Sequence, residues 1–454
     1  MNLEMTEAGV DYMPSAGDSQ FSNITFNNIS GTSNATSGHA TNVGRYYFGN
    51  TSSLLSGATA VGVYSADDFI NNFLSTSGAV GNSSAHIMSH AYIGNANASL
   101  QGAYSEVIKR FDFFSIDSRV LNIVGMNNGG TTPIPPIFGS TYNSISAGKL
   151  DGGHSHGFTP ANYPGPGRQK PDLVAAQNRT SWATGIIASA AAVLHAKAAS
   201  SGNPDATHPD TLKAVMLAGA TKARIPGWVQ TPSQPLDTTY GAGELNIFHS
   251  YRMLEQPGSS TGNVLSRGWA RNDVSSSNSR TYTFTTPNYD GMFTLSSALA
   301  WQRVVQETRR GFSFTYTYED LANLKLELLD GNDTVIRSSD SNLDNVEHIW
   351  NTSLAPDSTY KLKVSSNDRT ADFSLAWRIN IQDGGQLAPS VSEGNVVIDL
   401  SKLLSGVTCY IQRSTNLTNW SLVGSITATG STASWTDTNP PSGRAFYRAV
   451  YIEP

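Results

Sequence analysis

A serine stands at the start of a long helix-forming segment of this 454-residue chain. Ser181 lies in the run Arg179–Gly185, just before the Ala-rich stretch Ile186–Ala199, which predicts a helix. A hydroxyl at this position lies beside free backbone N–H groups and the positive end of the helix dipole. Both favour a nucleophile and the oxyanion that it creates. A serine before a helix is also a common N-cap, and we expect Ser181 to serve as the cap and to present its hydroxyl.

A serine hydroxyl is a weak nucleophile until a positioned base removes its proton, and that base is most often a histidine. His39 is the strongest candidate, because small residues surround it in the segment Ser37–Gly44. This segment also predicts the start of a short helix that runs through Tyr47. Taken alone, the same segment also fits a plain loop histidine. The base in turn needs a carboxylate to fix its tautomer and to stabilise the imidazolium.

Several motifs around these residues resemble those of subtilisin-like serine peptidases. KPDLVA at 170–175, followed by TSWAT at 180–184, is similar to the nucleophile region of that family. Ser37–Gly44 resembles the family motif Gly-His-Gly-Thr-His-Val-Ala-Gly, and the catalytic histidine falls on His39. YGAGELN at 240–246 resembles the motif that closes the catalytic domain. The resemblance covers residues 2 to about 252 and implies the acid, histidine, serine order of subtilisin.

The family aspartate falls on Glu7, at the end of the first predicted strand. Glutamate is one methylene longer, but it can still accept the imidazole N–H if the backbone or the histidine shifts by about one C–C bond. Asp11 and Asp18 are the other candidates, although both follow the strand in a turn-rich stretch. We therefore expect a triad of Glu7, His39 and Ser181.

The resemblance also implies an oxyanion hole and a substrate-binding edge. Val124–Gly130 resembles the family motif Ala-Ala-Gly-Asn-x-Gly, which assigns the side-chain amide of Asn127 to the oxyanion together with the Ser181 N–H. An Asn128-Gly129 turn is the plainer interpretation, and the two are compatible. Residues 85–94 resemble the segment that pairs with an extended substrate. The substrate contacts expected from these loops are Ala91, Tyr92, Ile93 and Met126.

Three further positions depart from the family pattern. Asn42 replaces the second histidine of the histidine motif, and Arg179 replaces the glycine before Thr-Ser. Gly185 replaces a proline in the first turn of the nucleophile helix, where proline is pre-organising. We expect Gly185 to loosen this helix and Arg179 to limit how closely the backbone approaches a substrate.

Apolar runs alternate with helical segments over residues 1–256, which predicts an α/β domain with a parallel sheet flanked by helices. Because of the resemblance, we expect this domain to be subtilisin-like. The expected strands are Leu3–Thr6, Ala58–Tyr64, Ala85–Tyr92, Val120–Met126 and Ser144–Gly148. The expected helices between them are Asp67–Leu74, with Ser65 as a cap, and Leu100–Phe113.

Two all-β domains are predicted after this one. Short alternating strands and turns over residues 257–383 predict an antiparallel sandwich of jelly-roll type, similar to the domains that follow many bacterial subtilases. Residues 384–454 predict a small β-sandwich, and Gln412–Trp420 resembles fibronectin-like modules at the ends of secreted bacterial proteins. We expect these domains to serve stability, surface attachment or substrate docking.

Composition narrows the class of protein and its partners. Charged residues make up only 14% of the chain, the net charge is −6 and there is no basic run, which argues against a nucleic-acid partner. No apolar run reaches the 18 or so residues that span a membrane. Cys409 is the single cysteine and excludes an internal disulfide framework. We expect a monomer that is secreted or at the cell surface, with its signal and propeptide segments missing from this sequence.

Metal sites are weakly indicated. His154 and His156 could suggest a metal, but the glycine-rich run around them fits a turn better. The loop Asp330–Asp333 has the oxygen donors that calcium prefers, and it fits a plain β-turn better still. We expect no metal ligands in the site and no cofactor for the chemistry, while structural calcium stays open.

The sequence therefore predicts a secreted serine endopeptidase that acts on protein or peptide substrates. The alternative is a catalytically weak or inactive surface or binding protein that keeps the subtilase fold. Hydrolysis of esters or other acyl groups by the same residues is a third hypothesis. Loss of the nucleophile, the base or the oxyanion donor would favour the second hypothesis, and all three are present as Ser181, His39 and Asn127.

Overall fold

The computed structural model describes residues 1–94, 101–130, 133–135, 137–289, 291–381, 386–417 and 419–451. Its first part contains a seven-stranded sheet in the order β2-β3-β1-β4-β5-β6-β9. The strands are β1 (Leu3–Glu7), β2 (Thr25–Asn28), β3 (Ala60–Ser65), β4 (Ile87–His90), β5 (Leu121–Gly125), β6 (Ser144–Lys149) and β9 (Leu173–Ala175). All neighbouring pairs are parallel, so their carboxyl ends lie at one edge, where sites in α/β proteins form.

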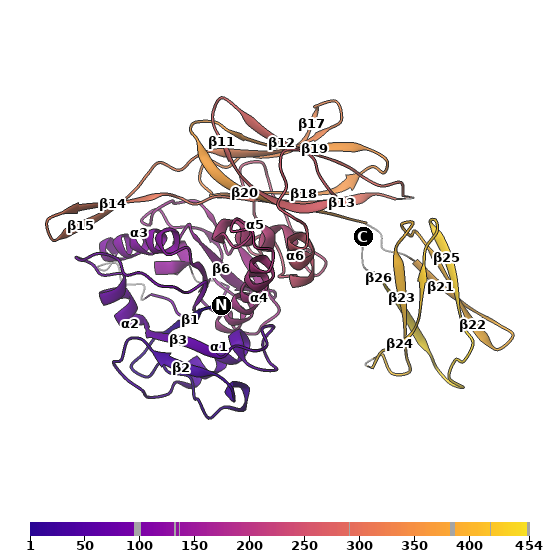
Figure 1. The fold of residues 1–454 in the computed structure, drawn as a ribbon, viewed down its shortest axis with the longest axis horizontal. Helices are drawn as coiled ribbons and strands as arrows, with labels where there is room; N and C mark the ends of the chain where they lie inside the picture. Colours follow the sequence, from indigo (N-terminus) through magenta and orange to yellow (C-terminus); the bar gives the residue numbers. More distant parts are fainter. Residues whose placement is uncertain are drawn as a thin grey trace.

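Helices cover both faces of this sheet (Figure 1). One core joins the sheet to α1 (Gly38–Phe48), α4 (Thr180–Ala199), α5 (Pro209–Gly219) and α6 (Ile247–Leu254). A second, largely aromatic core on the other face involves the π-helical η2 (Phe69–Phe73), α3 (Gln101–Asp117) and the 3-10 helix η4 (Ile137–Ser140). The short helix α2 (Ala66–Asp68) leads into η2. The side chains of α4 itself, mostly alanine with some isoleucine, are buried on nearly every side of the helix. This is expected for a helix that lies between a sheet and other helices.

Three short elements complete this part of the chain. They are the 3-10 helix η1 (Ser19–Phe21) and the two-residue strands β7 (Gly157–Phe158) and β8 (Gln169–Lys170), which pair with each other.

A β-sandwich follows, made of two sheets in the orders β10-β12-β19-β16-β17 and β11-β20-β13-β18. Its strands are β10 (Gly262–Asn263), β11 (Arg267–Val274), β12 (Ser279–Thr285), β13 (Phe293–Ala300), β16 (Leu324–Asp330), β17 (Val335–Ser339), β18 (Val346–Leu354), β19 (Thr359–Ser366) and β20 (Ala371–Ile381). Residues of both sheets, such as Leu326 and Leu375, share one core. All pairings are antiparallel except that of the short β10 with β12.

The outer face of the four-stranded sheet packs on α5. Its small residues Ala298, Ala300 and Ala376 belong to the core of the parallel sheet, so a helix can lie close to them. Arg378 of β20 is buried and donates from Nε to the Ala218 carbonyl and from Nη2 to the Ala220 carbonyl, both at 3.0 Å. The guanidinium therefore satisfies carbonyl groups at the C-terminal end of α5, and its positive charge interacts favourably with the negative end of the helix dipole.

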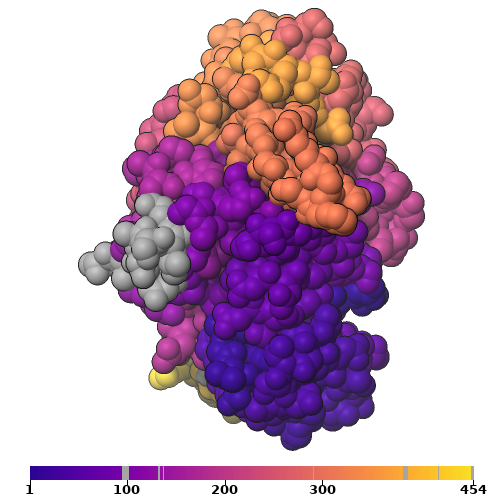
Figure 2. All heavy atoms as spheres, turned by 90° about the vertical axis from the view of Figure 1, so that its left-hand side faces the viewer, coloured from indigo at the N-terminus to yellow at the C-terminus, as the bar shows by residue number. Residues whose placement is uncertain are grey.

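A two-stranded arm formed by β14 (Val305–Arg310) and β15 (Ser313–Tyr318) leaves the sandwich and lies along α3 (Figures 1 and 2). The Val80 N–H donates to the Tyr316 hydroxyl at 2.8 Å. The Tyr318 hydroxyl donates to the buried carboxylate of Asp112. The arm is therefore fixed to the first domain by polar contacts as well as by packing.

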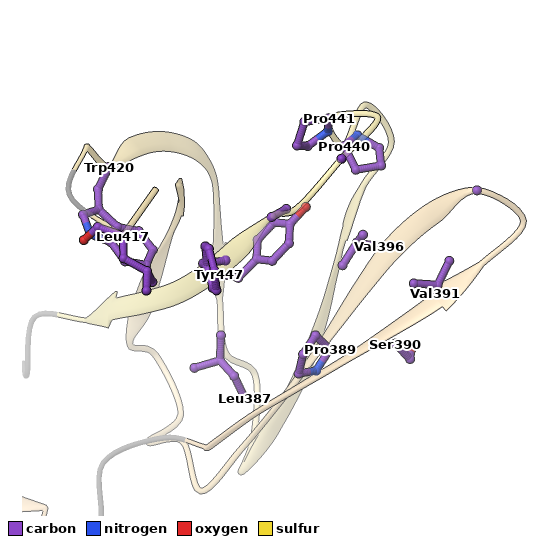
Figure 3. Close-up of a pocket in the computed structure, with 14 residues that line it drawn as sticks. Leu387, Pro389, Ser390, Val391, Val396, Leu417, Trp420, Pro440, Pro441 and Tyr447 are labelled. Carbon is purple, nitrogen blue, oxygen red and sulfur yellow. The ribbon is translucent and has the colours of Figure 1, made fainter. Parts of the chain in front are cut away.

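The C-terminal module has two three-stranded sheets, β21-β22-β25 and β24-β23-β26. Its strands are β21 (Gln386–Ser392), β22 (Asn395–Ser401), β23 (Thr408–Ser414), β24 (Ser421–Thr427), β25 (Thr432–Asp437) and β26 (Phe446–Tyr451). They enclose a core of their own that contains Cys409. An apolar cavity of about 750 Å³ is lined by residues of both sheets, including Leu387, Trp420, Pro440 and Tyr447 (Figure 3).

The expectation of an α/β domain followed by all-β regions is confirmed. The expected helical stretch Asp67–Leu74 is helical in the structure, where it is divided into the short α2 and the π-helical η2. Leu100, the expected start of the next helix, lies outside the described residues. In the part of the chain that the structure describes, no helix is long and apolar enough to cross a membrane.

Candidate active site

Glu7 is the last residue of β1, at the carboxyl edge of the parallel sheet. Its side chain is only 4% exposed, and its Oε1 lies 2.8 Å from His39 Nδ1. Burial raises the pKa of Glu7, while the hydrogen bond and the charge of His39 oppose that rise. The longer glutamate side chain therefore reaches the histidine without leaving the strand end.

His39 is the second residue of α1, whose N-cap is Ser37. The Ser37 hydroxyl accepts the Ala40 N–H at 3.2 Å, which fixes the first turn of the helix and hence the imidazole on it. The side chain is 40% exposed, so one side of the ring faces solvent. Nδ1 lies against Glu7 and Nε2 lies 3.0 Å from the Ser181 hydroxyl.

Ser181 is the second residue of α4, and the expectation that it caps this helix was wrong. The helix begins at Thr180, so Arg179 occupies the N-cap position with extended backbone (φ −138°). The intrahelical ladder begins with the Ala183 N–H on the Arg179 carbonyl at 3.0 Å. The Ser181 N–H precedes that ladder and points out of the helix end, as the first N–H groups of any helix do.

The three side chains form a line from carboxylate to imidazole to hydroxyl. This arrangement can fix the imidazole tautomer with a proton on Nδ1 and leave Nε2 to take the serine proton. The rival carboxylates lie elsewhere. Asp11 is exposed, and Asp18 is engaged by the Arg45 guanidinium at 2.5 Å and caps the short helix η1.

Asn127 follows β5, at the same edge of the sheet. A buried serine holds its backbone from both sides: the Asn127 N–H donates to Ser155 Oγ at 3.0 Å, and the Ser155 N–H donates to the Asn127 carbonyl at 2.9 Å. Sequence reasoning missed Ser155, because it lies in a run interpreted only as a turn.

Asn128 makes the bond that Arg179 does not make. Its Oδ1 accepts the N–H of Thr180, the first residue of α4, at 3.0 Å. Arg179 at the N-cap makes no side-chain cap bond. Asn128 therefore caps the nucleophile helix from another segment of the chain, a role for which the sequence shows no local signal.

Gly185 lets α1 and α4, the helices that carry His39 and Ser181, lie close together. A Cβ at this position would lie 2.9 Å from the Val43 carbonyl and 3.0 Å from Tyr46 Cβ, both in α1. The expectation that Gly185 loosens α4 therefore omitted its main effect, because the missing side chain lets α1 and α4 approach. Trp182 lies beside the same contact, with its ring centroid 5.5 Å from that of His39.

A buried charged cluster supports the segment that leads into α4. Asp172 accepts from Lys170 Nζ at 2.7 Å and from the Ser146 hydroxyl and N–H, and Lys213 Nζ lies 3.6 Å away. Burial alone would raise the pKa of Asp172, but the two ammonium groups and these donors hold it below its usual range. Burial lowers the pKa of Lys170 to about 8. This cluster gives the KPDLVA segment a structural role.

The expected substrate contacts lie at the carboxyl ends of β4 and β5. The Ala91 carbonyl lies 3.4 Å from the Ser181 hydroxyl, which places this segment beside the nucleophile. Tyr92 is half-buried and Ile93 is 41% exposed. Met126 is buried in the core at 1% exposure, so its side chain is not presented to solvent.

Residues of the two weakly indicated metal sites make hydrogen bonds or ion pairs within the protein. The His154 Nδ1 accepts the Lys149 N–H at 3.1 Å and its Nε2 lies 2.9 Å from the Thr239 carbonyl, so both ring nitrogens are engaged. Asp330 closes the turn between β16 and β17, and Asp333 pairs with Lys361. Within the described ranges, no group of three or more His, Cys, Asp or Glu side chains is arranged to hold a metal ion.

Comparisons with known proteins add little to this geometry. No protein-family model and no curated protein matches the chain. Among solved structures, tripeptidyl peptidase 2 aligns at a TM-score of 0.29 and 10% identity, over 92% of this chain and 52% of that one. The chain thus spans about half the length of that peptidase.

Two further solved structures align at similarly low similarity. The periplasmic assembly of the ESX-5 inner membrane complex aligns at a TM-score of 0.33 and 10% identity, over 55% of this chain and 78% of that one. The lysozyme inhibitor PliG of Salmonella Typhimurium aligns at 0.15 and 13%, over 27% and 99%. TM-scores this low carry no functional argument, so the function is argued from the site.

Proposed function

We propose that this protein is a subtilisin-like serine endopeptidase that hydrolyses peptide bonds. The observation that carries the proposal is the continuous line from Glu7 through His39 to Ser181, with contacts of 2.8 and 3.0 Å. Three segments far apart in the sequence meet in this line. Such a line at the carboxyl edge of a parallel sheet has the arrangement that activates a serine for acyl transfer.

The proposed reaction follows from the roles of the groups. Ser181 Oγ attacks the substrate carbonyl while His39 Nε2 takes the hydroxyl proton, and Glu7 holds the Nδ1–H and stabilises the imidazolium. The Ser181 N–H and the Asn127 amide stabilise the oxyanion of the tetrahedral intermediate. The imidazolium then returns its proton to the leaving amine, and water attacks the acyl-enzyme by the same steps.

The remaining parts of the proposal concern partners and location. The partner is a protein or peptide substrate that pairs along Ala91–Ile93, and the protein acts as a monomer, secreted or at the cell surface. The chemistry needs no cofactor, because serine, imidazole and backbone donors supply every step. The low charge content of 14% favours an extracellular location.

Covalent labelling tests the nucleophile. A fluorophosphonate should label the wild-type protein once, at Ser181, and should leave Ser181→Ala unlabelled, as mass spectrometry of the labelled peptide would show. Peptide and ester substrates then separate endopeptidase from esterase activity. A folded wild-type protein that is not labelled at any pH would support the alternative of a binding protein that keeps the fold without the chemistry.

The carboxylate is tested by a matched pair. Glu7→Gln keeps the size of the side chain but removes the acceptor that fixes the imidazole, so kcat should fall by about 10³–10⁴-fold with the fold intact. Asp11→Asn should leave kcat within about twofold, because Asp11 is exposed and lies after the strand. Asp11→Asn with the larger loss would show that the carboxylate is wrongly assigned.

A further inference from the structure

The two oxyanion donors of the proposed site stand on separate segments. Asn127 lies in the loop after β5, whereas the Ser181 N–H belongs to the first turn of α4. A tetrahedral intermediate can be stabilised only if both donors are held at the right spacing, and a shift of about 1 Å can cost about 10²-fold in rate. The link between the loop and the helix is therefore part of the catalytic geometry.

We propose that Asn128 is a positioning residue that fastens the oxyanion loop to the nucleophile helix. Its Oδ1 accepts the Thr180 N–H at 3.0 Å, and Thr180 is adjacent in sequence to Ser181, as Asn128 is to Asn127. One hydrogen bond thus joins the residues next to the two donors. The inference rests on the proposed function, because it concerns the spacing of donors used by that reaction.

The rest of the loop is built to keep Asn128 in place. The segment Gly153–Ser155 pairs with it through the Gly129 N–H on the Gly153 carbonyl at 3.0 Å and an antiparallel bridge between Asn128 and His154. His154 is fully buried and fills the space over Gly148, where a Cβ would lie 2.5 Å from its ring. Residues 153–155 therefore hold the backbone of this loop in place, and the Asn128 side chain bonds the loop to the start of α4.

The bond also directs the free N–H groups of the helix end. The first N–H groups of a helix lack intrahelical partners, and an N-cap side chain usually takes one of them. Here Asn128 takes the Thr180 N–H, so the next N–H, that of Ser181, is left to face a substrate. A capping side chain at position 179 would instead accept the N–H of Ser181 or of Trp182, because an N-cap side chain bonds to the second or third residue of its helix.

Two single variants remove the same bond from opposite sides. Asn128→Ala removes the acceptor and should lower kcat for peptide hydrolysis by about 10–100-fold, with KM within about threefold. Thr180→Pro removes the donor at the first helical position, where proline is favoured, and Arg179 before it already has the extended backbone that proline requires. It should lower kcat by a similar factor while leaving Tm unchanged or higher.

The double variant decides between positioning and mere stability. Asn128→Ala/Thr180→Pro should have the kcat of the slower single variant, because both changes break one bond. Asn178→Ala, an exposed asparagine two residues before Thr180, is the control and should keep kcat within twofold. Circular dichroism melting should show a loss of about 2–4 °C for Asn128→Ala alone.

The outcomes distinguish failure of the positioning role from failure of the proposed function. Folded single variants that keep kcat within about twofold, in a wild-type protein that the fluorophosphonate labels, overturn the positioning role alone. Rate losses that multiply in the double variant also overturn it, because they show two separate effects. A wild-type protein that is not labelled overturns the proposed function and the positioning role with it.

Discussion

The two β regions that follow the parallel sheet differ in how much core each shares with it. The sandwich of β10–β13 and β16–β20 contributes Trp269, Ala298, Ala300, Val346 and Ala376 to the core of the first domain. The C-terminal module has its own core, and its contacts with the sandwich include Leu404, Val407 and the Tyr289 hydroxyl on the Lys402 carbonyl. A β region that follows the α/β domain can therefore be part of that domain's core rather than a separate attachment.

The difference lies in what each region covers. The sandwich covers α5, which packs between it and the parallel sheet and is buried along its whole length. It also supplies the cation that satisfies the end of this helix and the arm that lies on α3. The sandwich therefore belongs to the folding unit of the site, whereas the module is attached to that unit from outside.

Truncation is the largest test of this comparison. A chain that ends at residue 256 exposes the side of α5 that packs on the sandwich, so we expect no soluble folded protein and no fluorophosphonate labelling. A chain that ends at residue 383 should keep labelling within about twofold, because only the edge of the sandwich core is uncovered. Labelling of the shorter chain, together with a cooperative melt, would show that the sandwich is dispensable.

A matched pair of arginines sharpens the same contrast. Arg378→Met leaves two buried carbonyl groups of α5 without their donor and should lower the free energy of unfolding by about 3–5 kcal/mol. Arg448→Met in the module removes an exposed cation over Trp420 and should cost about 1 kcal/mol or less. Urea unfolding followed by tryptophan fluorescence measures both, and equal losses would contradict the comparison.

A pair of glycines compares packing in the two regions. Gly185→Ala forces a Cβ against the backbone of α1, so we expect a loss of about 1–3 kcal/mol and a lower labelling rate, because His39 and Ser181 shift apart. Gly430→Ala in the module meets nothing within 4 Å and should change stability by less than about 0.5 kcal/mol. Thermal melts of both variants, with labelling rates, would check this.

Acid sensitivity should also differ between the regions. His90 is fully buried in β4 between Thr6 and Asn122, and burial lowers its pKa to about 3. The unfolded chain therefore takes up a proton near pH 6.5 that the folded chain refuses, and stability from this group is lost as pH falls from about 6.5 towards 3.

A variant isolates this contribution. The difference in unfolding free energy between wild type and His90→Gln should shrink by about 1.4 kcal/mol per pH unit between pH 6 and 4. The module has no histidine, and the pKa of its Asp437 is lowered, because bonds from Tyr447 and Arg413 outweigh burial. The stability that this carboxylate contributes is therefore lost only below about pH 4. A pH-independent difference would contradict the assignment to His90.

The resemblance to family motifs selected the site residues Glu7, His39 and Ser181. Periodicity and capping signals predicted only the strand end and the two helix starts near which these residues lie. The helix start was placed wrongly, because Asn128, 52 residues away in sequence, supplies the cap. Gly185 was interpreted from helix propensity alone, whereas its tertiary neighbours in α1 decide its role.

In the sandwich, too, tertiary contacts decide what the local sequence pattern cannot predict. Strand β13 has the sequence FTLSSALA. One face has Phe293, Leu295 and Leu299 together with Ser297, the other has only Thr, Ser and Ala, and all eight residues are buried. Alternation predicts the first face, but serine and alanine in a strand also fit solvent exposure. Only the helix packed on them shows that this second face is also buried.

The arm of β14 and β15 has a consequence for the order in which the protein is made. Val80 bonds to Tyr316, 236 residues later, and Asp112 bonds to Tyr318, 206 residues later. At a synthesis rate of about 5–20 residues per second, these partners of the first domain emerge some 10–50 s after it. Until then the carboxylate of Asp112 has the Tyr142 and Asn143 N–H donors of its own domain but not the Tyr318 hydroxyl. The helices that carry His39 and Ser181 are therefore synthesised before the arm that packs on the first domain.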